Sequence, residues 1–381
     1  MTLSSASSVS RSILWPKVWR WLFGKEAVRS SDQPRKSSVT VRMGGVEDGT
    51  MRSSLPPCTL EAIADPKNLL LAACKARKGK RRRPDVEMWW QRRESEVLRL
   101  SAALFAGTWR PAGYRFFEIH DPKRRMIAAA PFGDRVVHHA LCNLMAPHLE
   151  RRFIPRSYSC QVGKGTTAAR ECCRKLVNRH RWVLKCDVRK FFPSLDHEVL
   201  IEKLEGVFCC KGMLELCRLI IASHHTAGQE RLCGLPIGNL TSQIWGNFYL
   251  DDMDHFITEV QRHGDYLRYT DDFLAFGDDP AQLWHLHALI MEHLRRVRLQ
   301  LATPKSRLLA SREGIPFCGF TFIPGERPRV LGATKRRFEK RRYRLGLQAG
   351  VGAMTEAVFA WYQFSREGNT EGLRRAWGRL R

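Results

Sequence analysis

Two adjacent acids at the centre of an apolar run constrain the fold of this chain more than any other feature. The run extends from Tyr266 to Phe276, with Asp271 and Asp272 in its middle. Its alternation about that centre predicts a β-hairpin that carries the two acids. Carboxylates between buried strands are costly unless something binds them. The segment therefore predicts paired strands that present a binding site.

The chain contains two further Asp-Asp pairs, whose contexts differ from that of the first. Asp251-Asp252 continues a helical pattern, while Asp278-Asp279 precedes Pro280 in a polar loop. Both pairs are most simply solvated surface acids. We therefore expect the chemistry to depend on the first pair.

A third candidate acid follows a separate apolar run, Trp182 to Val188, which suits a buried strand with Asp187 near its end. If this strand lies beside the hairpin, the three acids form one cluster. Phosphoryl transfer needs such a cluster, because two divalent cations roughly 4 Å apart can activate a hydroxyl and neutralise leaving pyrophosphate. Magnesium takes oxygen ligands and keeps some of its water. The three acids therefore predict a magnesium site.

The charge of the chain selects a class of partner. Among 381 residues, 64 Lys and Arg stand against 38 Asp and Glu, a formal net charge of +26. Such an excess implies an extended polyanion, with nucleic acid the leading candidate. Structural binding, attachment to a membrane surface and polymerase activity fit the charge equally well. The motifs must decide between them.

The cysteines and the hydropathy indicate a reducing, cytoplasmic location. The 12 cysteines are scattered or adjacent, without a C-x-x-C pair, and we expect reduced thiols. A zinc site would have to use Cys209, Cys210, Cys217 and His224 or His225, a spacing that matches no familiar metal pattern. No run of about 18 apolar residues could cross a bilayer, so we expect no membrane partner.

The coarse pattern divides the chain into an irregular start and a structured remainder. Residues 1–80 are rich in Ser, Arg and Pro, and we expect a basic, largely irregular extension without catalytic role. Its apolar island, Ile13–Phe23, is either peripheral or a short amphipathic helix. The remainder predicts helices over 86–104, 134–149 and 241–257 and after 196, strands over 114–119 and 126–129, and a basic helical tail beyond 324.

Several ordered motifs resemble those of the reverse transcriptases, and together they span roughly Tyr114 to Phe322. The matching segments are Phe116–Ala129, Ser157–Thr167, Lys185–Phe192, Gly234–Gln243, the Tyr269–Asp272 box, Pro304–Ser306 and Phe317–Phe320. The resemblance implies an α+β fold: a right-hand polymerase with fingers, a palm of antiparallel sheet with helices, and a small helical thumb. The implied domains are an extension (1–80), an N-terminal helix with fingers (81–180), a palm with interleaved helices (181–322) and a basic thumb (323–381).

The implied activity is RNA-directed DNA synthesis. The expected partners are an RNA template, a DNA or RNA primer, deoxynucleoside triphosphates and a small basic accessory protein. The resemblance implies two Mg²⁺ ions, which Mn²⁺ could replace, at a site formed by Asp187, the adjacent Val188, Asp271 and Asp272. Lys305 either steadies or protonates pyrophosphate, or is an exposed basic residue of a loop.

Further roles follow from the same resemblance. Phe192 matches a steric gate that excludes the ribose 2′-hydroxyl. Lys123 and Arg125, in a basic turn, would neutralise the triphosphate, the alternative being a solvated turn. The rest of the expected nucleotide pocket is Val188, Ile237, Gly238, Ser242 and Gln243, and the expected primer grip is Phe317, Cys318, Gly319 and Phe320.

The lineage within the family is a finer question. Ile237 and Gln243 resemble enzymes of diversity-generating retroelements, whereas many related polymerases carry Gln where this chain has Ile237. A retron, group II intron-derived or phage-defence enzyme is an alternative, and so is a catalytically idle RNA-binding module. An RNA-dependent RNA polymerase is disfavoured by Phe192.

Overall fold

The computed structural model describes residues 55–120, 124–302, 306–348 and 350–378. A four-stranded sheet at its centre consists of β3 (Trp182–Asp187), β4 (Tyr266–Tyr269), β5 (Asp272–Gly277) and β6 (Arg307–Ala310). The strand order is β4-β5-β3-β6, and every neighbouring pair is antiparallel. The predicted hairpin and the predicted third strand are therefore neighbours in one sheet.

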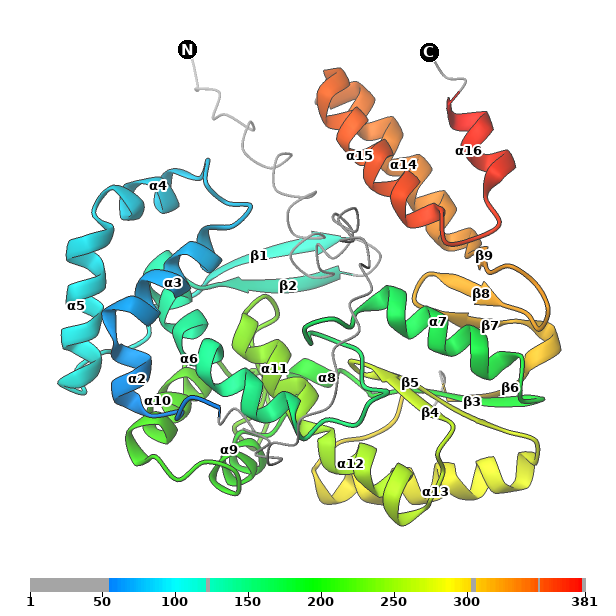
Figure 1. Ribbon diagram of the computed structural model, residues 1–381, viewed down its shortest axis with the longest axis horizontal. Coiled ribbons are helices and arrows are strands. Elements are labelled where there is room, and N and C mark those ends of the chain that lie inside the picture. The colour runs from blue at the N-terminus through cyan, green and yellow to red at the C-terminus, as the bar shows by residue number, and fades with distance from the viewer. Residues whose placement is uncertain (1–54, 121–123, 303–305, 349, 379–381) are drawn as a thin grey trace, which may run out of the picture.

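Helices cover both faces of this sheet. α13 (Pro280–Arg296) packs on β3, β5 and β6, while α7 (Thr166–Val177) packs on β4 from the other side (Figure 1). Alternate strand residues serve the two sides, so that Leu184 and Cys186 belong to the large hydrophobic core and Val183 to the smaller one around α7. Lys185 and Asp187 consequently share the face of Val183.

Two smaller sheets flank the central one. β1 (Arg115–His120) and β2 (Arg124–Ala129) form an antiparallel hairpin, close to the predicted strands. β7 (Ile315–Phe317), β8 (Phe320–Phe322) and β9 (Arg329–Val330) form a three-stranded sheet whose apolar side chains join those of α7.

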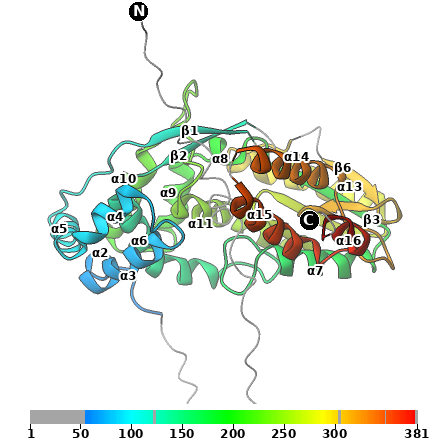
Figure 2. The same cartoon turned by 90° about the horizontal axis from the view of Figure 1, so that it is seen from above.

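A helical lobe lies at one end of the molecule and a helical tail at the other, as the view from above shows (Figure 2). The lobe packs around α6 (Phe132–Glu150). Its other helices are α2 (Leu60–Ala64), α3 (Pro66–Arg77), α4 (Pro84–Gln91), α5 (Arg93–Phe105), α9 (His197–Glu205), α10 (Lys211–Ala222) and α11 (Leu240–Tyr249). The tail holds α14 (Gly332–Gln348), α15 (Gly350–Ser365) and α16 (Glu371–Gly378). The short α8 (Phe191–Ser194) follows β3.

The structure corrects the expectation of a largely irregular segment over residues 1–80 only for the last part of that range, which is helical from Leu60 to Ala64 and from Pro66 to Arg77. α2 and α3 occupy much of its last part, and Leu69 and Ala73 of α3 are fully buried against α6. Asp65 caps α3, because its side chain accepts from the Lys67 backbone N–H at 2.6 Å. The leucines and alanines of this stretch were masked by the Ser- and Arg-rich composition before it. The island Ile13–Phe23 lies outside the described residues.

Two expected single helices are divided. The helix expected over 86–104 is interrupted at Arg92 between α4 and α5. The helix expected over 241–257 consists of α11, α12 (Asp251–His255) and a π-helical turn, Phe256–Val260. Asp251 is fully buried, so the expectation that both members of the Asp251-Asp252 pair are solvated is wrong for the first. Helical periodicity predicts which residues share a face but not which neighbouring element covers it.

Candidate active site

The sheet brings the three predicted acids to one end of β3 and β5. Asp187 and Asp272 are direct partners across the two strands, and their side chains therefore share one face. Just beyond this pair, the backbone N–H of Val188 donates to the carbonyl oxygen of Asp271 at 3.2 Å. The segments that carry the three predicted acids are thus neighbours, although the three carboxylates have different surroundings.

Asp271 has the surroundings of an acid that needs a cation. Burial raises its pKa to about 6, and repulsion from Asp187 and then Asp272 acts in the same direction. Its own backbone N–H and the positive charge of Arg125 oppose the rise in pKa. The hairpin β1–β2 therefore brings Arg125 near enough to act on Asp271.

Asp272 is paired with a cation from the chain itself. The Nζ of Lys185 lies 2.7 and 2.9 Å from its two carboxylate oxygens and also donates to the carbonyl oxygen of Pro316 at 2.9 Å. Sequence reasoning did not single out Lys185. The signal was a lysine inside an apolar strand, two residues before Asp187 and so on the same strand face.

The donor set fits a divalent cation that substrate helps to hold. Among the residues that the structure describes, no three His, Cys, Asp or Glu side chains are grouped closely enough to form a metal site by themselves. Asp187 and Asp271 are neighbouring acids whose like charges repel each other, so a cation between them would be stabilised. Magnesium commonly binds through one or two carboxylates together with substrate phosphates and water.

The predicted steric gate lies where β3 leads into α8. Phe192 is partly buried, with its ring 5.2 Å from that of Phe191, and its carbonyl accepts from the N–H of Leu235 at 2.9 Å. A Cβ on Gly246 of α11 would come within 3.3 Å of the Phe192 ring. Glycine at this position therefore lets the aromatic ring pack closely on α11, which restricts the ring's movement.

The loop before α11 joins the β1–β2 hairpin to the rest of the site. The backbone N–H of Ala128 in β2 donates to the carbonyl oxygen of Ile237 at 3.2 Å. Gly238 has a φ of 126°, a conformation that side chains disfavour. Arg125, Ile237 and Gly238 therefore lie on elements that this hydrogen bond connects.

The next two predicted pocket residues lie in the first turn of α11. Ser242 is buried, and its hydroxyl has no hydrogen-bond partner among the described atoms. The side-chain oxygen of Gln243 accepts from the thiol of Cys160 at 3.3 Å. Gln243 therefore contacts the Ser157–Thr167 segment, which the sequence analysis had identified as a separate motif.

The expected primer grip is the tight turn between β7 and β8. Phe317 pairs with Phe320, and the two residues between them, Cys318 and Gly319, have φ values of 42° and 87°. Positive φ at both central residues is typical of type I′ turns in hairpins. Lys185 connects this hairpin to Asp272, because the Pro316 carbonyl that accepts from Lys185 belongs to β7.

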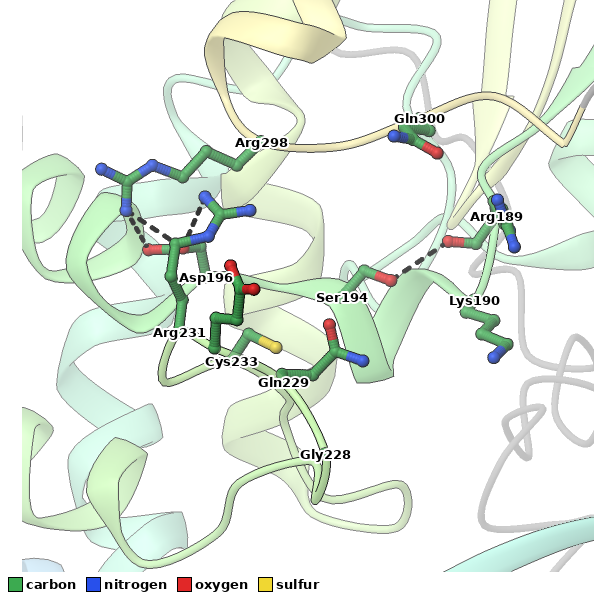
Figure 3. A pocket seen from close by; sticks show the side chains of 11 residues that line it. Arg189, Lys190, Ser194, Asp196, Gly228, Gln229, Arg231, Cys233, Arg298 and Gln300 are labelled. Atoms are coloured by element: carbon green, nitrogen blue, oxygen red, sulfur yellow. Dashed lines mark hydrogen bonds and ion pairs between the residues drawn. The ribbon is translucent and has the colours of Figure 1, made fainter.

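A polar pocket of about 460 Å³ opens beside the end of β3 (Figure 3). Asp196 pairs there with Arg298 at 3.0 Å and with Arg231 at 3.4 Å. Arg189 and Lys190, which follow Asp187 closely in the chain, add two further cations to the lining. The remaining lining residues are Ser194, Gly228, Gln229, Glu230, Cys233 and Gln300. Four basic and two acidic side chains favour anionic groups such as phosphate.

Other sequence expectations have mixed outcomes. Lys123 and Lys305 lie outside the described residues. Asp278 is exposed, as expected, and accepts from the backbone N–H of Arg181 at 2.9 Å. All 12 cysteines are free, and the described part of the chain holds no grouped ligands for the zinc site that the sequence had made improbable. No described helix is long and apolar enough to span a membrane.

Comparison with protein families gives a match over most of this site. The model of the family described as "Reverse transcriptase (RNA-dependent DNA polymerase)" matches residues 120–322, which run from the end of β1 to the end of β8. The chain belongs to the reverse transcriptase family. Its α+β fold with antiparallel sheets is as expected, and it is the right-hand polymerase fold of that family.

Individual relatives of this reverse transcriptase family member are distant. Protein YkfC of Escherichia coli (strain K12) is 26% identical over 176 residues, which are 44% of this chain and 46% of YkfC. The group II intron-encoded protein LtrA of Lactococcus lactis subsp. cremoris is 20% identical over 225 residues, 56% of this chain and 38% of LtrA. The chain thus spans less than half the length of these curated relatives.

Among solved structures, telomerase from Candida albicans in complex with a TWJ fragment of telomeric RNA is similar to this chain. The TM-score is 0.46 at 13% sequence identity, over 69% of this chain and 55% of that one. Apo telomerase from Candida tropicalis gives a TM-score of 0.43 at 13% identity, over 56% of this chain and 47% of the telomerase chain.

Proposed function

We propose that this chain is an RNA-directed DNA polymerase that copies an RNA template into complementary DNA by nucleotidyl transfer. The observation that carries the proposal is the meeting of Asp187 and Asp271 at the end of β3, within a family whose model covers this region. The deoxynucleoside triphosphate would lie between these acids, Arg125 of the fingers hairpin and the loop that carries Ile237.

We propose Mg²⁺ as the cofactor, with Mn²⁺ as a substitute. When bound, the ions would activate the primer 3′-hydroxyl and neutralise charge on the phosphates. The chain's own residues would hold and orient the substrates: Asp187 and Asp271 bind the ions, and Arg125 offsets charge on the triphosphate. Lys185 would remain with Asp272 and keep its charge balanced.

Two further groups would select and place the substrates. The ring of Phe192 would occupy the space that a ribose 2′-hydroxyl needs and thereby exclude ribonucleotides. The β7–β8 turn would contact the primer end. Beyond it, α14 presents the basic residues Lys335, Arg336, Arg337, Lys340, Arg342 and Arg344, which would grip the phosphates of the template–primer duplex.

Primer extension on an RNA template tests the proposal. We expect the wild-type chain with Mg²⁺ to extend a DNA primer, and chelation of the metal to stop extension. Asp271→Asn should lower the rate by at least about a hundredfold, because metal-held charge stabilisation is worth several kcal/mol. Asp278→Asn, which removes the charge of an exposed acid just after β5, is the matched control.

Equal losses of primer-extension rate in Asp271→Asn and Asp278→Asn would show that the wrong acidic pair had been chosen. Retained RNA binding by an inactive wild-type chain would instead favour the catalytically idle RNA-binding module.

Within the family we propose an enzyme of a diversity-generating retroelement, on the evidence of Ile237. An isoleucine side chain cannot form the hydrogen bonds of the Gln found in many related polymerases, and one lost bond alters discrimination by about 0.5 to 1.5 kcal/mol. We expect Ile237→Gln to lower the error rate, above all opposite template adenines. Sequencing complementary DNA made on one template measures this, and identical error spectra would refute the role of Ile237.

A group II intron-derived enzyme is the second candidate, because the relative LtrA is described as a group II intron-encoded protein. Sequencing the RNA that copurifies with the full chain separates the candidates. A structured intron RNA would favour the second candidate, and an RNA from a template repeat would favour the first.

A further inference from the structure

A fully buried ion pair lies beneath the turn that carries Asp271. Arg268 of β4 and Asp254 of α12 are both 0% exposed, and the Arg268 Nη2 is 2.5 Å from the Asp254 Oδ2. The Arg268 Nε lies 2.8 and 3.0 Å from the two oxygens of the same carboxylate. Tyr266 adds a hydrogen bond from its hydroxyl to Asp254 Oδ1 at 2.8 Å.

The remaining N–H groups of Arg268 reach α11 and the turn. Nη1 donates to Asn247 Oδ1 at 3.2 Å and to the carbonyl oxygen of Thr270 at 3.0 Å, while Nη2 also donates to the carbonyl oxygen of Asn247 at 3.2 Å. A guanidinium has five N–H groups in a fixed planar fork. All five have acceptors here, so the orientation of this side chain is completely specified.

The turn is held from a second side by Ser159. The Thr270 hydroxyl donates to Ser159 Oγ at 2.8 Å, and the Asn247 side chain donates to the Ser159 carbonyl oxygen at 2.5 Å. The network therefore closes on itself, from Arg268 through Asn247 and Ser159 to Thr270. Thr270 has a φ of 58°, which a β-branched residue adopts only where surrounding contacts enforce it.

One peptide group connects this network to Asp271. The carbonyl of the peptide between Thr270 and Asp271 accepts from Arg268, while the N–H of the same peptide interacts with the Asp271 carboxylate. Because the peptide is planar, fixing its carbonyl also fixes the direction of its N–H. The direction of that N–H in turn constrains the position of the carboxylate.

We propose that Arg268 is a positioning residue for nucleotidyl transfer, which fixes Asp271 through the Thr270 carbonyl with Asp254, Asn247 and Ser159 as supports. The proposal rests on the proposed function of the chain. Burying a charged pair is costly compared with apolar packing, so stability alone is a weak reason for its presence. The orientation of an acid that must hold a cation is a sufficient reason, since displacement on the order of 1 Å can cost about a hundredfold in rate.

The main test compares Arg268→Lys with Tyr266→Phe. Lysine keeps the positive charge next to Asp254 but has no planar fork that could also hold the Thr270 and Asn247 carbonyls. Tyr266→Phe removes one hydrogen bond to the same Asp254 and leaves every contact of Arg268 intact. The two variants therefore differ in whether the turn loses its support.

We expect Arg268→Lys to lower kcat at saturating nucleotide by about tenfold or more, with KM for the nucleotide changed far less. The Mg²⁺ concentration for half-maximal rate should rise. Mn²⁺ binding, followed by electron paramagnetic resonance of the full chain without substrate, should weaken in the same variant. Tyr266→Phe should resemble the wild type in all three measurements. A folded Arg268→Lys that behaves like Tyr266→Phe would overturn the proposal.

Ser159→Ala keeps the test decisive if Arg268→Lys does not fold. This variant removes the acceptor of the Thr270 hydroxyl, together with a long 3.4 Å hydrogen bond to the Cys160 thiol. We expect a smaller rise in the Mg²⁺ requirement together with weaker Mn²⁺ binding. Values equal to those of the wild type would then reject the positioning role. If the wild type itself extends no primer, the proposed function fails, and Mn²⁺ binding by the variants still decides whether Arg268 positions the site.

Discussion

The pKa of Asp271, which is partly exposed, and that of Asp251, which is fully buried, are both raised to about 6, but the two acids face different groups. Asp271 faces a second acid, Asp187, and the exposed Arg125 of the β1–β2 hairpin. Asp251 lies 3.5 Å from Arg152 and 3.6 Å from His255, and neither of its oxygens has a hydrogen-bond partner among the described atoms. Burial is the main cause of the higher pKa in both, so the raised pKa alone does not distinguish a site from a structural acid.

The difference in stability between the Asp251→Asn variant and the wild type should depend on pH. The folded-state pKa of Asp251 is about 6 against an ordinary value of 3.8, so the folded chain binds the proton more tightly than the unfolded chain. Ionisation therefore lowers the stability of the wild type as pH rises from about 4 to above 6. Asparagine does not ionise, so its stability relative to the wild type should increase over that range by about 2 to 3 kcal/mol.

Denaturant unfolding at several pH values measures this difference. A difference that does not change with pH would mean that Asp251 has its ordinary pKa. Primer extension by the Asp251→Asn variant should remain close to that of the wild type, since Asp251 takes no part in the proposed chemistry.

Phe192 provides the second prediction at the scale of single residues. Its ring is confined between Phe191 and Gly246, so truncation to alanine should open a space that neighbouring side chains do not refill. We expect Phe192→Ala to accept ribonucleotides more readily and to synthesise DNA less efficiently. The ratio of kcat/KM for a ribonucleotide to that for its deoxynucleotide measures this, and an unchanged ratio would remove Phe192 from the sugar pocket.

At the scale of elements, short hairpins carry the candidate site residues. One buried arginine joins α7 to β8 and to the helical tail. Arg170 of α7 donates to Glu367 Oε1 at 2.8 Å, and its guanidinium lies 4.9 Å from the ring centre of Phe320 and 5.2 Å from that of Phe364. Phe320 belongs to β8 and Phe364 to α15. The tail helices are therefore anchored on the β7–β8 hairpin by charge and by aromatic contact.

The turn of that hairpin allows a matched comparison of two glycines. Gly319 and Gly325 both have positive φ, 87° and 73°, but a Cβ on Gly319 would lie 2.9 Å from the Phe364 ring, while one on Gly325 would meet nothing within 4 Å. We expect Gly319→Ala to be less stable than Gly325→Ala by about 1 to 3 kcal/mol, the usual cost of overpacking.

Thermal unfolding of the two variants measures the difference. Equal destabilisation would mean that only the backbone conformation matters and that α15 does not press on the turn. Primer extension should also weaken in Gly319→Ala, because Phe364 would have to shift away from the hairpin.

At the scale of the whole molecule, the sequence predicted the elements that carry the chemistry better than those that support it. The strands ending at Asp187 and flanking Asp271 were correctly expected, because apolar runs with a central acid have few other interpretations. α2 and α3 were not, since propensity in a Ser- and Arg-rich region does not reveal the surface of α6 that buries them.

The supporting polar residues escaped prediction for a related reason. Arg268 stands in an apolar strand and Asp254 in a helix, 14 residues apart, and each alone resembles a solvated charge. Only the packing of α12 against β4 brings them together. Contacts between distant segments depend on tertiary structure, which periodicity within one segment does not encode.

The contacts of Lys185 have a consequence for how a duplex would move between nucleotide additions. Its ammonium spans Asp272 on one side and the Pro316 carbonyl on the other, so the acidic end of the sheet and the β7–β8 turn keep a constant spacing. In the proposed reaction, the duplex would advance by one base pair past these two points after each addition. The movement would then be confined to the nucleic acid and to parts of the chain outside this pair, and every nucleotide would be added at the same distance from the turn.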